Sequence, residues 1–224
     1  MTQMEKAKRG TITEEMRYVA AVEGVDPEDL RRRIAAGVAI ISKNIRHHFN
    51  PIGVGQGLST KTNANIGTSG HHQQLHEELE KLRMAVTCGA EMVMDLSTGD
   101  ELDRVRREIL RRCPVILGTV PIYQAVADRG SVHEMTADGL FEVIEKHARD
   151  GVDFVTVHCG VTREAVRRLD ADGRIAGIVS RGGSMLASWM ARSGEENPLF
   201  TQYDRLLDIA FEYDTDLWLL KSGR

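Results

Sequence analysis

The sequence predicts an α/β fold: an incomplete (β/α)8-type barrel of about six βα units, preceded by a small N-terminal α/β module. Short apolar runs alternate with amphipathic segments of helical period, which is typical of parallel strands covered on both faces. Polar side chains follow the carboxyl ends of these runs, where barrel enzymes hold their active sites. About 165 residues follow the first module, against roughly 250 for a complete barrel. A doubly wound open sheet is the alternative architecture.

Residues 1–58 form the expected N-terminal module. Two helices are expected at about 13–24 and 26–37, because each begins with a capping residue and ends at a glycine. A short strand over 38–41 leads into the loop NIRHHFNPIGVGQG, whose glycines and proline are typical of a join between two modules. We therefore assign residues 59–224 to the partial barrel, which binds the substrate.

The partial barrel is expected to alternate strands and helices along its length. The expected strands are residues 60–66, 92–97, 115–120, 153–158, 175–180 and 216–220. The expected helices are residues 71–87, 162–169, 185–192 and 201–213, with two more around Ile109 and Ile144. The first of these helices carries Leu75, Leu79 and Leu82 on one face, which indicates packing against the sheet.

The composition bears on partners and on cellular location. The chain has 224 residues, 42% of them hydrophobic, and a formal net charge of −4. We expect no general attraction for nucleic acid or for an anionic membrane, and neither a secretory signal nor a membrane-spanning segment. Cys88, Cys113 and Cys159 are odd in number and widely spaced, which indicates interior thiols in a reducing, cytoplasmic setting.

Four polar or polarisable side chains near the strand ends are candidate ligand contacts. Asn65 offers an amide donor and acceptor, or else closes an Asx turn. Met94 either contacts a ligand or fills the core, and Tyr123 either donates its hydroxyl or packs beside a proline. His158 interrupts an apolar strand at its tip, either as a ligand contact or as a structural imidazole.

The stretch Ser180-Arg181-Gly182-Gly183-Ser184 lies between an expected strand and the first turn of a helix. Glycines let backbone N–H groups approach an anion closely, and a helix N-terminus adds partial positive charge. The guanidinium of Arg181 matches the geometry of a phosphate. A plain turn with a surface arginine is the alternative, but the stretch favours a phosphate site.

Two other clusters carry weaker signals. His72 and His76 are four residues apart, a spacing that suits zinc, but the sequence supplies no third ligand nearby, so no metal site is assigned. The basic residues Arg106, Arg107, Arg111 and Arg112 alternate with acids at helical spacing, which predicts a solvated helix face.

Five ordered motifs resemble one enzyme family over residues 10–213. The motifs are TNANIG, MDLSTG, GTVPIYQA, TVHCGVT and GIVSRGGS. In this order they resemble the phosphomethylpyrimidine synthases, the ThiC family of thiamine biosynthesis. The family positions that grip the substrate ribonucleotide match Asn65, Met94, Tyr123, His158, Ser180, Arg181 and Gly182.

The resemblance implies a cytoplasmic, homodimeric radical S-adenosylmethionine enzyme with a (β/α)8 barrel. Such an enzyme converts 5-aminoimidazole ribonucleotide into hydroxymethylpyrimidine phosphate, with a [4Fe-4S] cluster, S-adenosylmethionine and zinc as its cofactors. The resemblance assigns no catalytic residue within this chain.

The sequence departs from the family pattern near residue 214. The family continues with Asp-Gly-x-Arg-Pro-Gly, whereas this chain reads DTDLWLLKSGR. The family's later glutamate, its two zinc histidines and its Cys-x2-Cys-x4-Cys cluster motif do not appear, so we expect this truncated chain to lack cofactor ligands. A 5-hydroxybenzimidazole synthase of cobalamin biosynthesis and a non-catalytic ribonucleotide-binding remnant are the alternatives.

Overall fold

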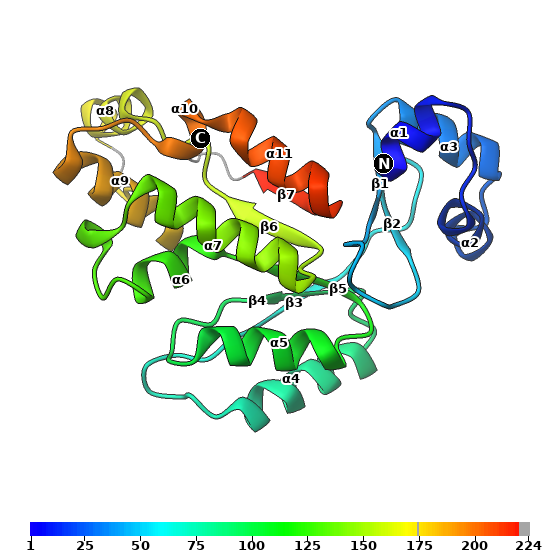
Figure 1. Cartoon of the computed structure of the whole chain (residues 1–224), viewed down its shortest axis with the longest axis horizontal. Helices are drawn as coiled ribbons and strands as arrows, with labels where there is room; N and C mark the ends of the chain where they lie inside the picture. The colour runs from blue at the N-terminus through cyan, green and yellow to red at the C-terminus, as the bar shows by residue number, and fades with distance from the viewer. Residues whose placement is uncertain (174, 220–224) are drawn as a thin grey trace.

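The structure, a computed structural model, describes residues 1–173 and 175–219 (Figure 1). Its centre is a parallel sheet of five strands in the order β3-β4-β5-β6-β7. The strands are β3 (Asn63–Ile66), β4 (Met92–Asp95), β5 (Ile116–Thr119), β6 (Phe154–Val157) and β7 (Asp216–Leu219). Each strand pairs with the next one in the sheet in parallel register, and β3 and β7 form the two edges. The predicted mixed α/β class is therefore confirmed.

Helices connect the strands and build the main hydrophobic core on one face of the sheet. They are α4 (Leu75–Thr87), α5 (Leu102–Arg112), α6 (Pro121–Ala127), α7 (Ala137–Asp150), α8 (Arg163–Asp172), α9 (Arg181–Ser193), α10 (Pro198–Thr201) and α11 (Tyr203–Tyr213), with a 3-10 turn at Val132–Glu134. Val93, Leu117 and Val155 point from the strands into this core and are at most 1% exposed.

The N-terminal segment has a hydrophobic cluster of its own. It consists of α1 (Gln3–Lys8), α2 (Glu14–Glu23), α3 (Pro27–Ala35) and the antiparallel pair β1 (Ala39–Ser42) and β2 (Ile52–Gly55). Thr13 and Asp26 cap α2 and α3 through their side-chain oxygens, as the sequence predicts. The expected joining loop is partly ordered instead as β2, because its residues 52–55 pair with β1.

One predicted strand is wrong. Residues 175–180 form a turn and an irregular segment, with the side chains of Ile175 and Val179 exposed, and β7 pairs directly with β6 in their place. Gly177 adopts a left-handed φ of 55°, which is incompatible with an extended strand. Pairing with β7 stacks Trp218 on Phe154, with ring centroids 4.2 Å apart. The sheet therefore has five parallel strands rather than six, and residue 220 of the last predicted strand lies outside the described residues.

The other face of the sheet receives the N-terminal segment. Met92, Ile116 and Phe154 form a small apolar cluster on this face, and Phe49 and Ile52 pack against it. Gly118 is required within β5, because any Cβ there would overlap the ring of Phe154. Among the described residues, no helix is long and apolar enough to cross a bilayer.

A buried polar joint ties the N-terminal segment to the sheet. Asp153 accepts hydrogen bonds from the backbone N–H groups of Asn44 and Leu117, both at 2.8 Å, and pairs with Nδ1 of His47 at 2.6 Å. Burial raises the pKa of Asp153, and the contacts with His47 and the backbone oppose that rise. The Asn44 amide donates to the carbonyl oxygens of Ala148 and Val152. The base of β5 and β6 is thereby fixed to the N-terminal segment.

We predict that Asp153→Ala lowers the free energy of unfolding by about 3–5 kcal/mol, because it leaves buried donors without an acceptor. Equilibrium urea denaturation of the chain measures this loss, and Asp170→Ala, which changes an exposed residue of α8, is the matched control. A loss equal to that of the control would show that Asp153 does not hold the joint.

Candidate functional site

The carboxyl ends of the parallel strands carry several of the residues predicted from the sequence. Asn65 on β3 pairs in register with Met94 on β4, and Met94 in turn with Gly118 on β5. The hydroxyl of Thr156 on β6 donates to the sulfur of Met94 at 3.4 Å, so side chains from β4 and β6 meet across β5. Met94 is half-buried at this edge, whereas its neighbour Met92 is fully buried in the apolar cluster. The exposure favours Met94 over Met92 as a ligand contact.

His158 lies directly after β6 and is only 2% exposed. Its Nε2 is 2.7 Å from the Ser180 hydroxyl, which also accepts a hydrogen bond from the N–H of Gly183. Desolvation lowers the pKa of His158 to about 4, so its imidazole is neutral near pH 7. In a neutral imidazole one nitrogen donates and the other accepts a hydrogen bond, so with Nε2 engaged by Ser180 the Nδ1 atom is the nitrogen that can pair with a ligand.

The N-terminus of α9 is built against that imidazole. Ser180 is the N-cap residue, and Gly182 and Gly183 in the first turn are both buried. A Cβ at position 182 would overlap Cε1 of His158 and lie 2.9 Å from Nδ1, so only glycine fits there. The first N–H groups of a helix lack intrahelical partners and favour an anion. The glycines therefore bring the helix N-terminus and His158 into direct contact.

Arg181 and Tyr123 add charge and an aromatic surface to this group. The guanidinium of exposed Arg181 lies 5.6 Å from the ring centroid of Tyr123, the third residue of α6. Burial raises the pKa of the half-buried Tyr123, and Arg181 opposes the rise. A guanidinium, a phenol and a helix N-terminus together suit a ligand that carries both a phosphate and a ring.

The structure brings Tyr123, His158, Ser180, Arg181 and Gly182 into one group. Asn65 and Met94 form a second pair at the same edge of the sheet. The exposed Asn65 side chain accepts a hydrogen bond from the Asn63 amide at 3.0 Å, and Met94 reaches β6 through Thr156. No described contact joins Asn65 to His158, so the shared strand edge is what relates the two groups.

Asn197 is a positioning residue that the sequence did not reveal. It is fully buried, and its amide donates to the carbonyl oxygens of His158 and Val161, both at 2.9 Å. Its own Oδ1 accepts from the N–H of Leu199 at the start of α10. The pair Asn197-Pro198 signals a helix start, but nothing in the sequence indicates that it also holds the turn after β6.

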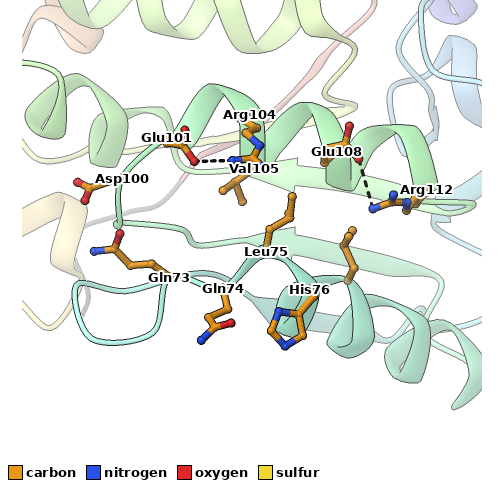
Figure 2. A pocket seen from close by; sticks show the side chains of 11 residues that line it. Gln73, Gln74, Leu75, His76, Asp100, Glu101, Arg104, Val105, Glu108 and Arg112 are labelled. Carbon is orange, nitrogen blue, oxygen red and sulfur yellow. Dashed lines mark hydrogen bonds and ion pairs between the residues drawn. The ribbon is translucent and has the colours of Figure 1, made fainter.

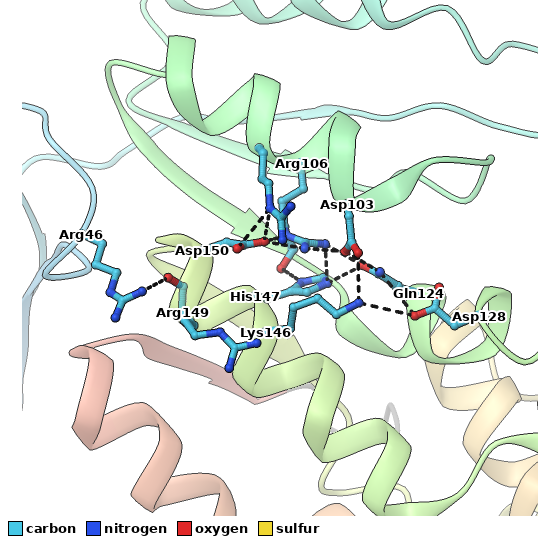
Figure 3. A network of polar contacts seen from close by, with 11 residues as sticks. Arg46, Asp103, Arg106, Gln124, Asp128, Lys146, His147, Arg149 and Asp150 are labelled. Atoms are coloured by element: carbon cyan, nitrogen blue, oxygen red, sulfur yellow. Dashed lines mark hydrogen bonds and ion pairs between the residues drawn. The ribbon is translucent and has the colours of Figure 1, made fainter.

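A buried polar network supports α6 next to Tyr123 (Figure 3). Arg106 on α5 is 2% exposed, so the predicted solvated helix face is wrong at this position. It donates to Asp150 at 2.6 Å, to Oε1 of Gln124 at 2.5 Å and to Nε2 of His147 at 3.0 Å. Desolvation, assisted by the positive charge of Arg106, lowers the pKa of His147 well below its ordinary value. Arg106 is buried because these acceptors from α6 and α7 surround it.

A separate groove of about 640 Å³ runs between α4 and α5 (Figure 2). His76, Glu101, Arg104 and Glu108 are among its lining residues, and it contains none of the predicted ligand contacts. Within residues 1–173 and 175–219, no group of three metal-ligating side chains converges, at His76 or elsewhere. Cys113 and Cys159 are buried as predicted, but Cys88 is exposed just after α4, where an interior position was expected.

Fold and geometry together define an α/β protein with a candidate anion site at the carboxyl ends of its parallel strands. The Radical SAM ThiC family model matches residues 2–224. Proteins named phosphomethylpyrimidine synthase are similar to this chain: those of Desulforamulus reducens, Thermodesulfovibrio yellowstonii and Pyrococcus furiosus are 52%, 53% and 51% identical over 98% of it. The chain belongs to the radical SAM ThiC family. It spans about half the length of the curated relatives it matches, 52% in each of these three.

We predict that His158 makes the fold less stable in mild acid. Unfolded histidine takes up a proton below its ordinary pKa of about 6.5, but folded His158 does so only near pH 4. The stability that neutral His158 contributes is therefore complete above pH 6.5 and falls by about 3 kcal/mol toward pH 4. Urea denaturation across this range, compared with His158→Gln, measures it. Parallel curves for the two proteins would contradict the burial of a neutral imidazole.

Proposed function

We propose that this chain forms the substrate-binding part of a phosphomethylpyrimidine synthase and binds 5-aminoimidazole ribonucleotide. The observation that carries the proposal is the contact of His158 with Ser180 and Gly182, which joins the end of β6 to the N-terminus of α9. A phosphate and a nitrogen heterocycle are the two parts of this substrate, and a helix N-terminus beside a neutral imidazole offers a partner for each.

Each predicted contact has a proposed role toward one part of the ribonucleotide. Arg181 and the first N–H groups of α9 bind the phosphate, with Ser180 and Gly182 shaping that turn. His158 hydrogen-bonds to the aminoimidazole ring, and the ring of Tyr123 packs beside Arg181. Asn65 and Met94 complete the site from β3 and β4. Asn65 on β3 and Arg181 at the start of α9 are both exposed, which supports access for a ligand.

We also propose that the five-stranded sheet is part of a (β/α)8 barrel, with residues 1–58 as a separate module. A doubly wound sheet reverses its strand order at a switch point, whereas this sheet runs in chain order from β3 to β7. That order supports the wall of a barrel. The separate hydrophobic cluster of the N-terminal segment supports the division at residue 58.

The family implies S-adenosylmethionine and an iron–sulfur cluster as cofactors. The residues described here do not fit a cluster: two of the three thiols are buried, the third is exposed, and no group of ligands converges. We propose that the cluster, S-adenosylmethionine and zinc are bound by the part of the family sequence that this chain does not span. The homodimer and the cytoplasmic location are proposed from the same resemblance.

A non-catalytic ribonucleotide-binding role is the second candidate, because the contact of His158 with Ser180 that supports ribonucleotide binding involves no cofactor. The names of the relatives favour the pyrimidine product over 5-hydroxybenzimidazole. Calorimetry with 5-aminoimidazole ribonucleotide tests the binding that both candidates share. Absence of binding would overturn both.

We predict that Arg181→Ala weakens binding of the ribonucleotide roughly ten- to hundredfold, because one charge-assisted hydrogen bond to phosphate contributes about 1.5–3 kcal/mol. Isothermal titration calorimetry measures the change. Arg192→Ala, at an exposed position in the last turn of the same helix, is the control. Equal affinities in the two variants would remove Arg181 from the site.

We predict that Gly182→Ala weakens ribonucleotide binding by roughly tenfold or more, because the new methyl group displaces the imidazole of His158. Calorimetry gives the affinity, and the NMR signals of the His158 ring report its displacement. Gly70→Ala is the matched control, since a Cβ there meets no atom within 4 Å. An unchanged affinity together with unchanged ring signals would contradict the contact.

A further inference from the structure

A second candidate binding site lies near the amino ends of the strands, on the opposite side from His158 and beside the buried joint formed by Asp153 and His47. Its cavity has a volume of about 360 Å³, within the range of small-molecule pockets. The N-terminal segment forms one wall, and the C-terminal ends of α5 and α7 form the other. The lining residues are Arg46, His47, His48, Arg107, Leu110, Arg111, Cys113 and Asp150.

Positive charge dominates this cavity. Three guanidinium groups line it against one carboxylate, that of Asp150. Asp150 is already engaged by buried Arg106 at 2.6 Å, and Arg107 shares the same carboxylate at 3.2 Å. Arg111 likewise shares Glu108 with Arg112. Asp150 and Glu108 are thus each shared by two arginines.

Arg46 is the least neutralised of the three. Within the described part of the chain it has no carboxylate partner: its Nη1 donates to the carbonyl oxygen of Arg149, as Figure 3 shows, and its guanidinium lies 5.6 Å from the ring centroid of Tyr213. Cations commonly accompany helix C-termini, which accounts for arginines on α5. Arg46 likewise contacts a helix C-terminus, because Arg149 lies in the last turn of α7, but it comes to the cavity from the N-terminal segment.

The walls of the cavity are held in place without a ligand. His47 is fixed between Asp153 and the carbonyl oxygen of Cys113, at 2.6 and 2.9 Å. The backbone N–H of Arg46 donates to the Asn44 side chain at 2.9 Å. A rigid wall reduces the entropy that binding would otherwise cost.

We propose that this cavity binds a small phosphate-bearing anion at a site distinct from that at Arg181. Guanidinium groups match phosphate oxygens in charge and geometry, and the surplus of arginines over carboxylates supplies the attraction. An anion bound here contacts Arg46 on the N-terminal segment and Arg107 or Arg111 on α5 at once. Binding therefore strengthens the attachment of the N-terminal segment to the sheet.

Calorimetry with pyrophosphate tests the proposal, carried out on the unmodified full chain and on the full chain with Arg181→Ala, in which binding at the first site is weakened. We expect binding to persist in this background, to weaken with added salt, and to fall roughly tenfold or more with Arg46→Ala or with Arg111→Glu. Arg192→Ala is the control for the loss of an exposed arginine. Urea denaturation shows whether each variant is folded, and the two variants act on different walls of the cavity.

Three results would overturn the proposal: no binding of millimolar pyrophosphate by the unmodified chain, binding that Arg181→Ala abolishes, or binding by Arg46→Ala and by Arg111→Glu that is as tight as that of the Arg192→Ala control. Titrations with inorganic phosphate, ADP and adenosine identify the part of the ligand that is recognised. Tighter binding of ADP than of pyrophosphate indicates a nucleotide, and equal binding indicates the phosphate groups alone. Adenosine binding as well as ADP would contradict recognition of phosphate.

Discussion

The candidate site depends on one close approach, that of the α9 backbone to the imidazole of His158. The approach exists because position 182 has no side chain and because Ser180 caps the helix while contacting the same ring. It places the end of β6 next to the N-terminus of α9, although α9 begins more than twenty residues later in the chain. The amide of Asn197 then fixes the turn that carries His158 from the other side. Burial of the ring, and with it the neutrality of the imidazole, follows from this packing.

Much of this arrangement could be predicted from local patterns. Apolar runs bounded by glycine or proline gave β4, β5 and β6 to within about two residues, and the motif around Arg181 predicted a helix N-terminus correctly. Residues 175–180 were mistaken for a strand because an apolar run does not specify its pairing partner. The strand that pairs with β6 is β7, and this pairing stacks Trp218 on Phe154, which lies sixty-four positions earlier in the chain. The burial of Arg106 likewise depends on acceptors contributed by two other helices.

The carboxyl ends and the amino ends of the parallel strands differ in structure and in proposed role. At the carboxyl ends, the side chains of Asn65 and Arg181 are exposed next to the buried sheet, which suits a ligand site. At the amino ends of the strands, Asp153 pairs with Asn44 and His47 of the N-terminal segment and with the backbone N–H of Leu117 on β5, which holds the N-terminal segment in place. Family membership agrees with this division, since four of the five ordered motifs contain the carboxyl end of a strand and the fifth contains the N-terminus of α9.

The order of the sheet has a consequence for handling the protein in solution. Among the described residues, β3 and β7 each have one side whose backbone N–H and C=O groups pair with no other strand of the sheet. Near β7, the exposed apolar side chains of Leu207, Phe211 and Leu219 add surface that water solvates poorly. Such an edge is a template for intermolecular strand addition. We therefore expect aggregation during expression and concentration to depend on the edge strands β3 and β7 more than on the modest net charge.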